Sequence, residues 1–204
     1  MLNQIIKKID ALSQQHQPIL LAIAGPPAAG KSTLAAKILT HYGDEAVILP
    51  MDGFHLDNVI LQEKNLLARK GAPESFDALG FMDVVKQVAA GKTRYAPVFA
   101  PVFDRKLDLA RAGAIAIHKQ PIIIVEGNYL LFEEKPWCDL KPYWNLSIWL
   151  DMDEKEMEKR CIQRWLDHEL SLEQAKKRCH DNDLANAKRI IHQRLPADIS
   201  LVGS

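Results

Sequence analysis

Two kinds of apolar pattern alternate along the chain: short uninterrupted runs, and longer segments in which apolar residues recur every three or four positions. The short runs are bounded by glycine, proline or acidic residues and predict buried strands. These runs are 19–24, 46–49, 122–125, 146–150 and 197–202. The longer segments predict helices with one apolar face. These segments are 3–15, 31–42, a stretch containing Phe81 and Val85 that ends near Gly91, 153–168 and 171–187.

Strands that alternate with helices predict an α/β fold, here a three-layer α/β/α sandwich with a mostly parallel central sheet. The tandem Ala-Pro-Val-Phe sequences at 96–103 do not fit a central strand, because proline cannot donate a ladder hydrogen bond. We expect this segment to be an excursion beside the sheet edge, followed by a short strand at 115–117. Residues 51–77 are expected to form a functional loop with a short helix around 59–68. No repeat or linker divides the chain, so we expect a single domain, 1–204.

The charge of the chain is balanced, with 26 Lys and Arg residues against 26 Asp and Glu residues among 204. A chain without net charge has no broad electrostatic surface for nucleic acid or an anionic membrane, so we expect neither as a partner. Three cysteines without CxxC spacing argue against a disulfide framework and favour a reducing compartment. The first residues lack the apolar core of a signal peptide, and no run approaches the roughly 20 apolar residues of a membrane-spanning helix. The expected location is the cytoplasm.

The segment 25–32 joins the predicted strand 19–24 to the predicted helix 31–42 and reads Gly-Pro-Pro-Ala-Ala-Gly-Lys-Ser. This is the G-x-x-x-x-G-K-[ST] pattern of a P-loop, in which backbone N–H groups and the helix N-terminus bind phosphate oxygens. In this pattern Lys31 bridges the β- and γ-phosphates of ATP, and the Ser32 hydroxyl ligates Mg²⁺. The predicted nucleotide-binding residues of this segment are Gly25, Pro26, Pro27, Ala28, Ala29, Gly30, Lys31, Ser32 and Thr33.

Two acidic residues follow predicted strands, Asp52 after 46–49 and Glu126 after 122–125. Ligands of open α/β sheets collect outside the carboxyl ends of the strands, so both carboxylates are expected to face the phosphates. Asp52 is our candidate for the base that takes the proton of an attacking hydroxyl, and it also helps to hold Mg²⁺. Glu126 is the candidate for a further Mg²⁺ ligand, directly or through water. The alternatives are an Asp-Gly turn at Asp52 and a strand-end turn at Glu126.

Four motifs, at 25–32, 51–55, 71–77 and 125–131, together resemble the superfamily of uridine kinase, phosphoribulokinase and bacterial pantothenate kinase. The resemblance runs in order through residues 18–202 and is strongest to a branch labelled nucleoside/nucleotide kinase-like or fructose-transport-associated kinases. It implies a P-loop NTPase fold of the nucleoside kinase type, the use of ATP and Mg²⁺, and a helical lid.

The resemblance places the lid at about 153–185 and implies roles for individual residues. Asp77 falls where uridine kinases place an acid on the substrate hydroxyls, and Arg164 falls where pantothenate kinases place a lid arginine on the transferring phosphoryl group. The uridine kinase base-recognition pattern is replaced here by 102–106, Val-Phe-Asp-Arg-Lys, and the substrate region of pantothenate kinase is much shortened. The resemblance also implies the roles already given above for four residues: Lys31, Ser32, Asp52 and Glu126.

Arg160, Arg164 and His168 recur every four residues, so they share one face of the predicted helix 153–168. Guanidinium groups suit phosphate oxygens, and a lid that closes over ATP needs such donors. Arg160 is therefore a predicted nucleotide-binding residue and Arg164 a predicted catalytic residue. The alternative is a solvated face on which Glu156 pairs with Arg160.

The predicted substrate-binding residues are His55, Arg69, Asp77, Asp104 and Arg105. A hydrogen-bonded structural histidine is the alternative for His55, and Arg69 either binds an anionic group or faces water. Asp77, Asp104 and Arg105 indicate an acceptor with several hydroxyl groups, and an anionic acceptor is among those they allow.

The chain lacks the N-K-x-D motif of regulatory GTPases and the L-S-G-G-Q-like signature of transport ATPases, which favours a small kinase. We expect an ATP-dependent enzyme that transfers the γ-phosphate to a hydroxyl of a small metabolite: a sugar, a nucleoside, a pantothenate-like compound or a hydroxy acid. An ATP-binding regulator without a metabolite acceptor is the alternative, and a ligase-like or hydrolytic enzyme is a third. Kinases of this superfamily often pair, so a homodimer is also open.

Overall fold

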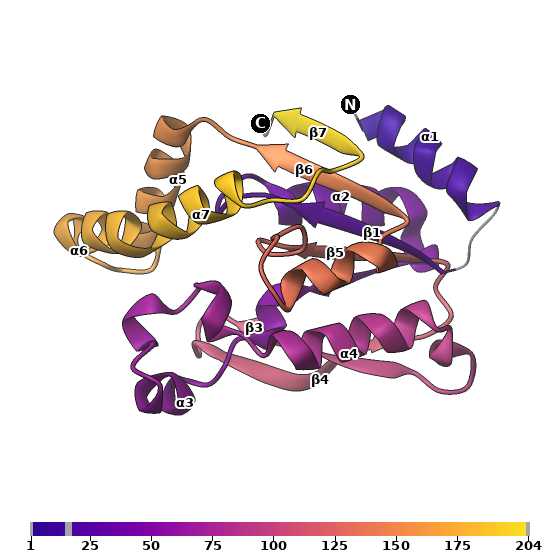
Figure 1. The fold of residues 1–204 in the computed structure, drawn as a ribbon, viewed down its shortest axis with the longest axis horizontal. Coiled ribbons are helices and arrows are strands. Elements are labelled where there is room, and N and C mark those ends of the chain that lie inside the picture. The colour runs from indigo at the N-terminus through magenta and orange to yellow at the C-terminus, as the bar shows by residue number, and fades with distance from the viewer. Residues whose placement is uncertain (1, 15–17, 203–204) are drawn as a thin grey trace.

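A five-stranded parallel sheet forms the centre of the protein, whose structure is a computed structural model that describes residues 2–14 and 18–202 (Figure 1). The strand order is β2-β5-β1-β6-β7, and every neighbouring pair in it is parallel. The strands of this sheet are β1 (Ile19–Ala24), β2 (Ala46–Pro50), β5 (Ile122–Gly127), β6 (Leu146–Asp151) and β7 (Ile199–Val202). The helices are α1 (Leu2–Ser13), α2 (Lys31–Tyr42), α3 (Asn58–Glu63), α4 (Ala78–Ala89), α5 (Glu154–Asp167), α6 (Leu172–Arg178) and α7 (Ala185–His192).

The central strand β1 shows why the sequence forms this sheet. All six of its residues are buried, and successive side chains point to opposite faces. Leu20 and Ala22 belong to one core, which α4 covers, whereas Leu21 and Ile23 belong to the other, which α1 and α2 cover. A strand buried on both faces needs an uninterrupted apolar run, as the sequence has here. The three-layer sandwich predicted from the sequence is confirmed.

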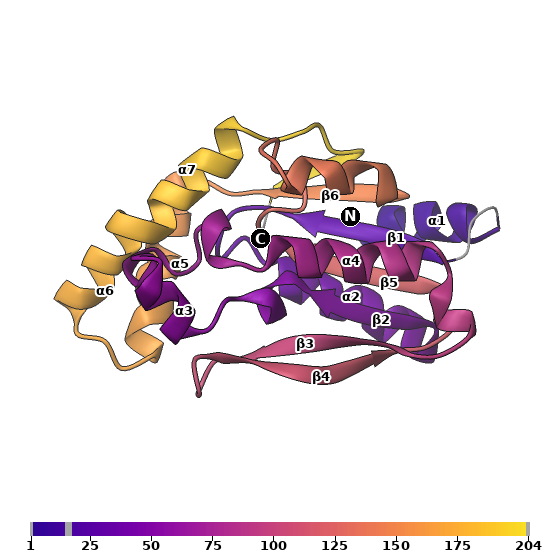
Figure 2. The ribbon, with the colours of Figure 1, turned by 60° about the horizontal axis from the view of Figure 1, so that its bottom comes forward.

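The tandem at 96–103 leads into a hairpin that stands apart from the central sheet. β3 (Val98–Asp104) pairs antiparallel with β4 (Leu109–Ile117) in a separate two-stranded sheet. Figure 2 shows this hairpin running beside β2 at the sheet edge. Its register shifts between Ala100 and Val102, on either side of Pro101, which cannot donate a ladder hydrogen bond. The predicted excursion is therefore present, but the strand expected at 115–117 begins six residues earlier, at Leu109.

The other sequence expectations differ from the structure mainly at element ends. The short helix expected around 59–68 is α3 followed by a separate 3₁₀ turn, Leu67–Arg69. The last helix, expected at 171–187, continues to His192 through a π-helical turn, Cys179–Leu184. The first helix ends at Ser13, and residue 15, the last one expected in it, lies outside the described residues.

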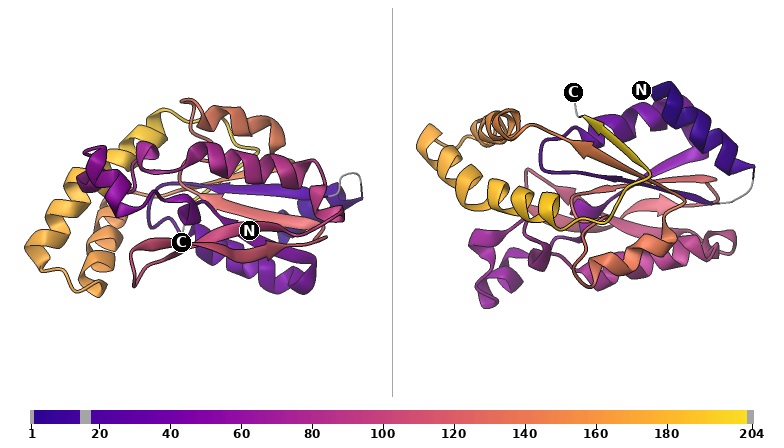
Figure 3. Two further views of the ribbon diagram at one scale, coloured as in Figure 1. Left: turned by 90° about the horizontal axis from the view of Figure 1, so that it is seen from below. Right: turned by 45° about the horizontal axis from the view of Figure 1, so that its top comes forward.

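The helices α5, α6 and α7 gather at one end of the molecule, beyond the carboxyl ends of the sheet strands (Figure 3). Asp153 caps α5 by accepting hydrogen bonds from the N–H groups of Lys155 and Glu156. Ser171 and Gln174 form a capping box at the start of α6, as their spacing predicts. α3 and the turn between β3 and β4 lie at the same end of the molecule (Figure 2), so the carboxyl ends of the strands face several segments that are distant in sequence.

Candidate active site

The P-loop lies between β1 and α2, at the carboxyl end of the central strand. Gly25 has a φ of 156°, and a Cβ at this position would lie 2.5 Å from the carbonyl oxygen of Leu150 in β6, so only glycine fits. Ala28 adopts the left-handed conformation with a φ of 62°. Gly30, with a φ of 87°, precedes the first residue of α2. The segment is therefore curled rather than straight, as a ring of phosphate-binding amides requires.

Lys31 is buried inside this loop, with 9% of its surface exposed, and its Nζ donates a hydrogen bond to the carbonyl oxygen of Pro26 at 2.8 Å. Burial lowers the pKa of Lys31 to about 8. The carboxylates of Glu126 and Asp52 oppose this shift, and the charge of Arg164 adds to it. The ammonium group thus lies within the electrostatic reach of both predicted strand-end acids and of the predicted lid arginine.

Glu126 and Ser32 meet at the carboxyl ends of β5 and β1. The Ser32 Oγ donates a hydrogen bond to Glu126 Oε2 at 3.2 Å. Burial raises the pKa of Glu126, and the nearby charge of Asp52 adds to the increase, while Lys31 opposes it. Glu126 lies inside β5 rather than after it, beside Pro50 of β2 in the parallel ladder. The register thereby brings a carboxylate and a hydroxyl, both oxygen ligands, to the mouth of the P-loop.

Asp52 lies two residues beyond Pro50, in a 3₁₀ turn, Met51–Phe54. The hairpin packs directly on this turn, because a Cβ on Gly53 would lie 2.2 Å from the carbonyl oxygen of Pro101. Arg105, which follows β3, donates a hydrogen bond from Nη2 to Asp52 Oδ2 at 3.2 Å. The Asp-Gly turn considered as an alternative is thus present, and it holds the carboxylate beside a cation.

His55 packs against two aromatic rings next to this turn. Its ring centroid lies 4.0 Å from that of Phe76 and 4.6 Å from that of Phe103, and its Nδ1 lies 2.8 Å from the carbonyl oxygen of Asp52. Burial lowers the pKa of His55, although Asp52 opposes this. Lys70 also contacts Phe103, with its Nζ 5.0 Å from the ring centroid.

Lys70 and Asp108 form an ion pair at 2.9 Å between the loop and the hairpin turn. Lys70 also donates to the side-chain oxygen of Asn58 and to the carbonyl oxygen of Asp108, and Asn58 donates to the Asp108 carboxylate. The side chain of Lys70 is 5% exposed. Because the cation is fully paired, it fixes the hairpin turn against α3 rather than presenting a free charge.

Helix α5, part of the predicted lid, carries two arginines near the P-loop. Arg160 pairs with Glu156 at 2.7 Å, and its Nη1 donates a long hydrogen bond of 3.5 Å to the carbonyl oxygen of Ala28. Arg164 pairs with Asp183 of the π-helical turn at 3.0 Å. The predicted pair of Arg160 with Glu156 is therefore formed together with a contact to the P-loop.

Hydrogen bonds also join the loop around Arg69 and Lys70 to the π-helical turn and α7. Arg69 donates to the carbonyl oxygen of Asp181 at 2.9 Å and to Asn186 Oδ1 at 2.8 Å. Asn182, buried in the π-helical turn, donates to the carbonyl oxygen of Lys70 at 2.7 Å. These segments are thus held together through both side chains and backbone.

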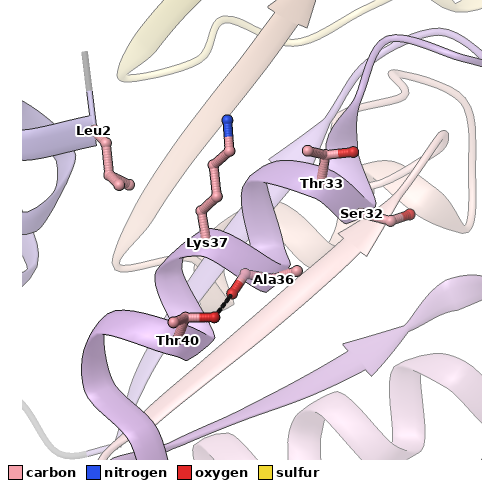
Figure 4. A pocket seen from close by; sticks show the side chains of 6 residues that line it. All are labelled: Leu2, Ser32, Thr33, Ala36, Lys37 and Thr40. Atoms are coloured by element: carbon pink, nitrogen blue, oxygen red, sulfur yellow. Dashed lines mark hydrogen bonds between the residues drawn. The ribbon is translucent and has the colours of Figure 1, made fainter.

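An open pocket of about 690 Å³ continues from the P-loop along α2 (Figure 4). Its lining residues are Leu2, Ser32, Thr33, Ala36, Lys37 and Thr40. Figure 4 shows Lys37 projecting from α2, and Leu2 facing it from α1.

Comparison with known proteins gives a consistent picture. A candidate uridine kinase of Schizosaccharomyces pombe is 31% identical over 212 residues, which cover 98% of this chain and 89% of that protein. The crystal structure of a candidate fructose transport system kinase from Silicibacter sp. TM1040 is 42% identical, covers 95% of this chain and 98% of its own, and has a TM-score of 0.84. The chain belongs to the P-loop kinase superfamily of uridine kinase, phosphoribulokinase and bacterial pantothenate kinase.

A pantothenate kinase of Levilactobacillus brevis is also similar to this member of the superfamily, with 33% identity over 159 residues. The match covers 74% of this chain but only 51% of that enzyme, so the chain spans about half the length of that relative. A search of protein-family models found no match. No helix among the described residues is both long enough and apolar enough to span a bilayer.

The structure brings together a part of the residues predicted to form the site. Those that meet around the P-loop mouth are Lys31, Ser32, Asp52, Arg105 and Glu126.

Asp77 caps α4, since its Oδ1 accepts a hydrogen bond from the N–H of Gly80 at 2.9 Å. Asp104 caps the hairpin turn by accepting from the N–H groups of Lys106 and Leu107. Arg69 does not face water only, because it donates hydrogen bonds to Asp181 and Asn186. The substrate-binding roles of all five predicted residues, which also include His55 and Arg105, stay predictions.

Sequence reasoning missed the polar residues of the π-helical turn. Asp183 is 7% exposed, yet nothing in its sequence neighbourhood distinguishes it from a solvated acid. Its partners Arg164 and Trp165 lie in α5, nearly twenty residues earlier. The capping box at Ser171 could have indicated that two helices pack as a pair here, but not which residues face each other.

Proposed function

We propose that this protein is an ATP-dependent kinase that transfers the γ-phosphoryl group to a hydroxyl of a small metabolite. The observation that carries the proposal is the convergence of Lys31, Ser32, Glu126 and Asp52 at adjoining strand ends. Phosphoryl transfer asks a protein mainly to position two reactants and to neutralise charge, and these groups supply both functions. We take residues 1–204 as one domain, with 153–185 as its lid.

In this mechanism Lys31 exchanges the carbonyl oxygen of Pro26 for oxygens of the β- and γ-phosphates. The acceptor hydroxyl attacks the γ-phosphorus, a new O–P bond forms, and the bond to the β-γ bridging oxygen breaks to release ADP. Asp52 accepts the proton of the attacking hydroxyl. The charge of Arg164 reaches the Lys31 site, which suits neutralisation of the transferring group once the lid closes.

The donor set suits magnesium, because the Ser32 hydroxyl and the Glu126 carboxylate are hard oxygen ligands 3.2 Å apart. No group of three or more His, Cys, Asp or Glu side chains in the described part of the chain is arranged to hold a metal by itself. Ser32 and Glu126 would therefore share the ion with phosphate oxygens, as Mg²⁺ commonly does in such enzymes. When bound, Mg²⁺ supplies charge neutralisation at the phosphates.

The pocket beside α2 is our candidate for the nucleoside part of ATP. It starts at Ser32 and Thr33, where the phosphate chain leaves the P-loop, and extends to Leu2 and Lys37. Its apolar lining suits a base. The relatives named above are kinases of different small molecules, so the acceptor class is not carried over from any one of them.

The decisive test replaces the base. We expect Asp52→Asn to reduce phosphoryl transfer about 10²- to 10⁴-fold while Mg²⁺-ATP affinity changes little, because the amide cannot accept the proton. Transfer is followed by mass spectrometry as a gain of one phosphoryl group in a metabolite library. Asp44→Asn, in the exposed turn before β2, is the matched control.

Full turnover by the Asp52→Asn variant would remove Asp52 from the chemistry. Stoichiometric ATP binding without transfer to any acceptor would instead favour the ATP-binding regulator. Phosphate release that does not depend on an added acceptor would favour a hydrolase.

A further inference from the structure

The two lid helices enclose a cluster of charged residues around one tryptophan. The guanidinium of Arg178, at the end of α6, lies 4.4 Å from the centre of the Trp165 ring, and that of Arg164 lies 5.0 Å from it. Asp183 accepts a hydrogen bond from Trp165 Nε1 at 2.6 Å and pairs with Arg164 at 3.0 Å. Two arginines and one carboxylate therefore share this aromatic platform.

The cluster is electrostatically incomplete. The Nε atoms of Arg164 and Arg178 are both buried, and neither has a hydrogen-bond acceptor among the described residues. The one carboxylate of the cluster is already bonded to Arg164 and Trp165, and within the described ranges Arg178 forms no ion pair. Buried N–H donors without acceptors are costly, and each calls for an explanation. An anionic ligand would satisfy these donors and balance the excess positive charge.

Arg178 lies near the segments that we assign to the acceptor side of the site. It lies four residues before Asn182 along the continuous helix, and Asn182 contacts the backbone of Lys70. Burial alone would raise the pKa of Asp108, but bonds from Asn58 and Lys70 and, more weakly, the charge of Arg178 lower it. The charge of Arg178 therefore reaches the hairpin turn, whereas the charge of Arg164 reaches Lys31.

The hairpin turn cannot serve as the partner of Arg178. Asp108 is bonded to Lys70 at 2.9 Å and to Asn58 at 2.9 Å, and it lies beyond ion-pair distance of Arg178. A row of contacts joins Asp52 to this turn through His55, Phe103 and Lys70. A ligand that reaches Arg178 while its hydroxyl lies at Asp52 would span this row of residues.

We propose that Arg178 is a specificity-determining residue that binds a carboxylate or phosphate group of the acceptor, remote from the hydroxyl that receives the phosphoryl group. Arg164 then serves the donor side of the same platform. The inference rests on the proposed kinase function and narrows its substrate class to anionic hydroxyl compounds. Neutral sugars and nucleosides lack the group that Arg178 would hold.

Arginine Nε–H NMR signals test the binding directly, without turnover. The full chain is saturated with Mg²⁺ and a non-hydrolysable ATP analogue, so that the P-loop is filled, and is then titrated with inorganic phosphate or with acetate. The Arg178 signal, assigned by its disappearance in Arg178→Lys, is expected to shift saturably with one anion or both. The anion that shifts it at lower concentration identifies phosphate or carboxylate as the preferred group. An Arg178 signal that neither anion moves overturns the proposal.

Kinetics with matched acceptors test the specificity. Each neutral compound is paired with its anionic counterpart: glycerol with glycerate, pantothenol with pantothenate, and free sugars with their phosphates. We expect the wild type to transfer the phosphoryl group to the anionic member of a pair. Arg178→Met should raise the KM for that anionic acceptor roughly 10- to 100-fold, while the KM for ATP stays unchanged. Arg178→Lys should recover part of the loss, and Lys176→Met, an exposed neighbour, should match the wild type.

The outcomes separate this inference from the proposed function. Preferred transfer to a neutral acceptor, with no effect of Arg178→Met, overturns the anion site and leaves the kinase intact. An Arg178 signal that responds to anions, in a protein that phosphorylates no member of the panel, supports the anion site and counts against the kinase.

Discussion

The proposed phosphate-donor end of the site and its proposed acceptor-and-lid side are built in different ways. The donor end is one continuous segment, 25–33, anchored to the central strand and to a helix. The acceptor side combines the turn at Asp52, the β3–β4 turn, the loop around Lys70 and the π-helical turn of the lid. The donor end therefore depends on local backbone geometry, and the acceptor side on contacts between distant segments.

This difference indicates where substrate choice can vary without loss of the phosphate chemistry. A change in the hairpin or the lid alters the partners of Asp52 or Lys70 but leaves the P-loop backbone in place. The relatives, named as kinases of different small molecules, fit such a division. Substitutions on the two sides should therefore separate ATP binding from acceptor binding.

Apart from that of Asp52→Asn, the largest effect is expected at the donor end. Lys31→Met should lower phosphoryl transfer about 10²- to 10³-fold, because it removes the one ammonium group that contacts both phosphates. The protein should remain folded, since methionine fills the same buried volume without a charge to desolvate. Transfer assays and thermal unfolding measure the two quantities. A folded Lys31→Met protein with normal transfer would contradict the donor-end assignment.

The next effect is expected between the loop and the lid. Arg69→Met removes the hydrogen bonds to Asp181 and Asn186, which should lower the free energy of unfolding by about 1–3 kcal/mol. The KM for the acceptor should rise, while ATP affinity, measured by calorimetry, should stay the same. Arg94→Met, at an exposed position outside these contacts, is the control. A large loss of ATP affinity in Arg69→Met would show that the two sides are not separable.

A smaller effect follows from the buried ammonium group. Since the free protein holds Lys31 with a pKa of about 8 and phosphates require its charged form, ATP binding must take up a proton above that pH. ATP affinity should be constant below pH 7 and fall about ten-fold between pH 7 and pH 9. Lys31→Arg, whose guanidinium stays charged in this range, should abolish the decrease. An unchanged decrease in that variant would assign the pH dependence to another group.

The smallest effect tests the two roles of Asp77. Loss of its helix cap in Asp77→Ala should cost about 1 kcal/mol of stability. Asp77→Ser keeps a capping oxygen without the carboxylate, so it should recover that stability. If Asp77 also holds acceptor hydroxyls, the acceptor KM should remain raised in Asp77→Ser. A normal KM in Asp77→Ser would leave Asp77 as a cap only.

The sequence predicted the central sheet, because each buried strand carries an uninterrupted apolar run with a clear end. It also predicted the P-loop and the two acids, since these follow strands whose carboxyl ends must meet. It did not predict the length of β4, in which Ala110 to Ala114 include no large apolar residue. The π-helical turn was missed as well, because an extra residue in a helix turn leaves no signal in periodicity.

The sequence by itself therefore determined the sheet, the phosphate loop and the kinase superfamily, because those depend on local patterns of apolar residues, glycine and one lysine. Only the tertiary structure decided that Arg105 lies at Asp52, that Arg69 is bonded to the lid, and that Arg178 shares a tryptophan with Arg164. Such contacts join segments far apart in the chain. Their formation depends on how the helices and the hairpin pack, and no single segment of the sequence determines that packing.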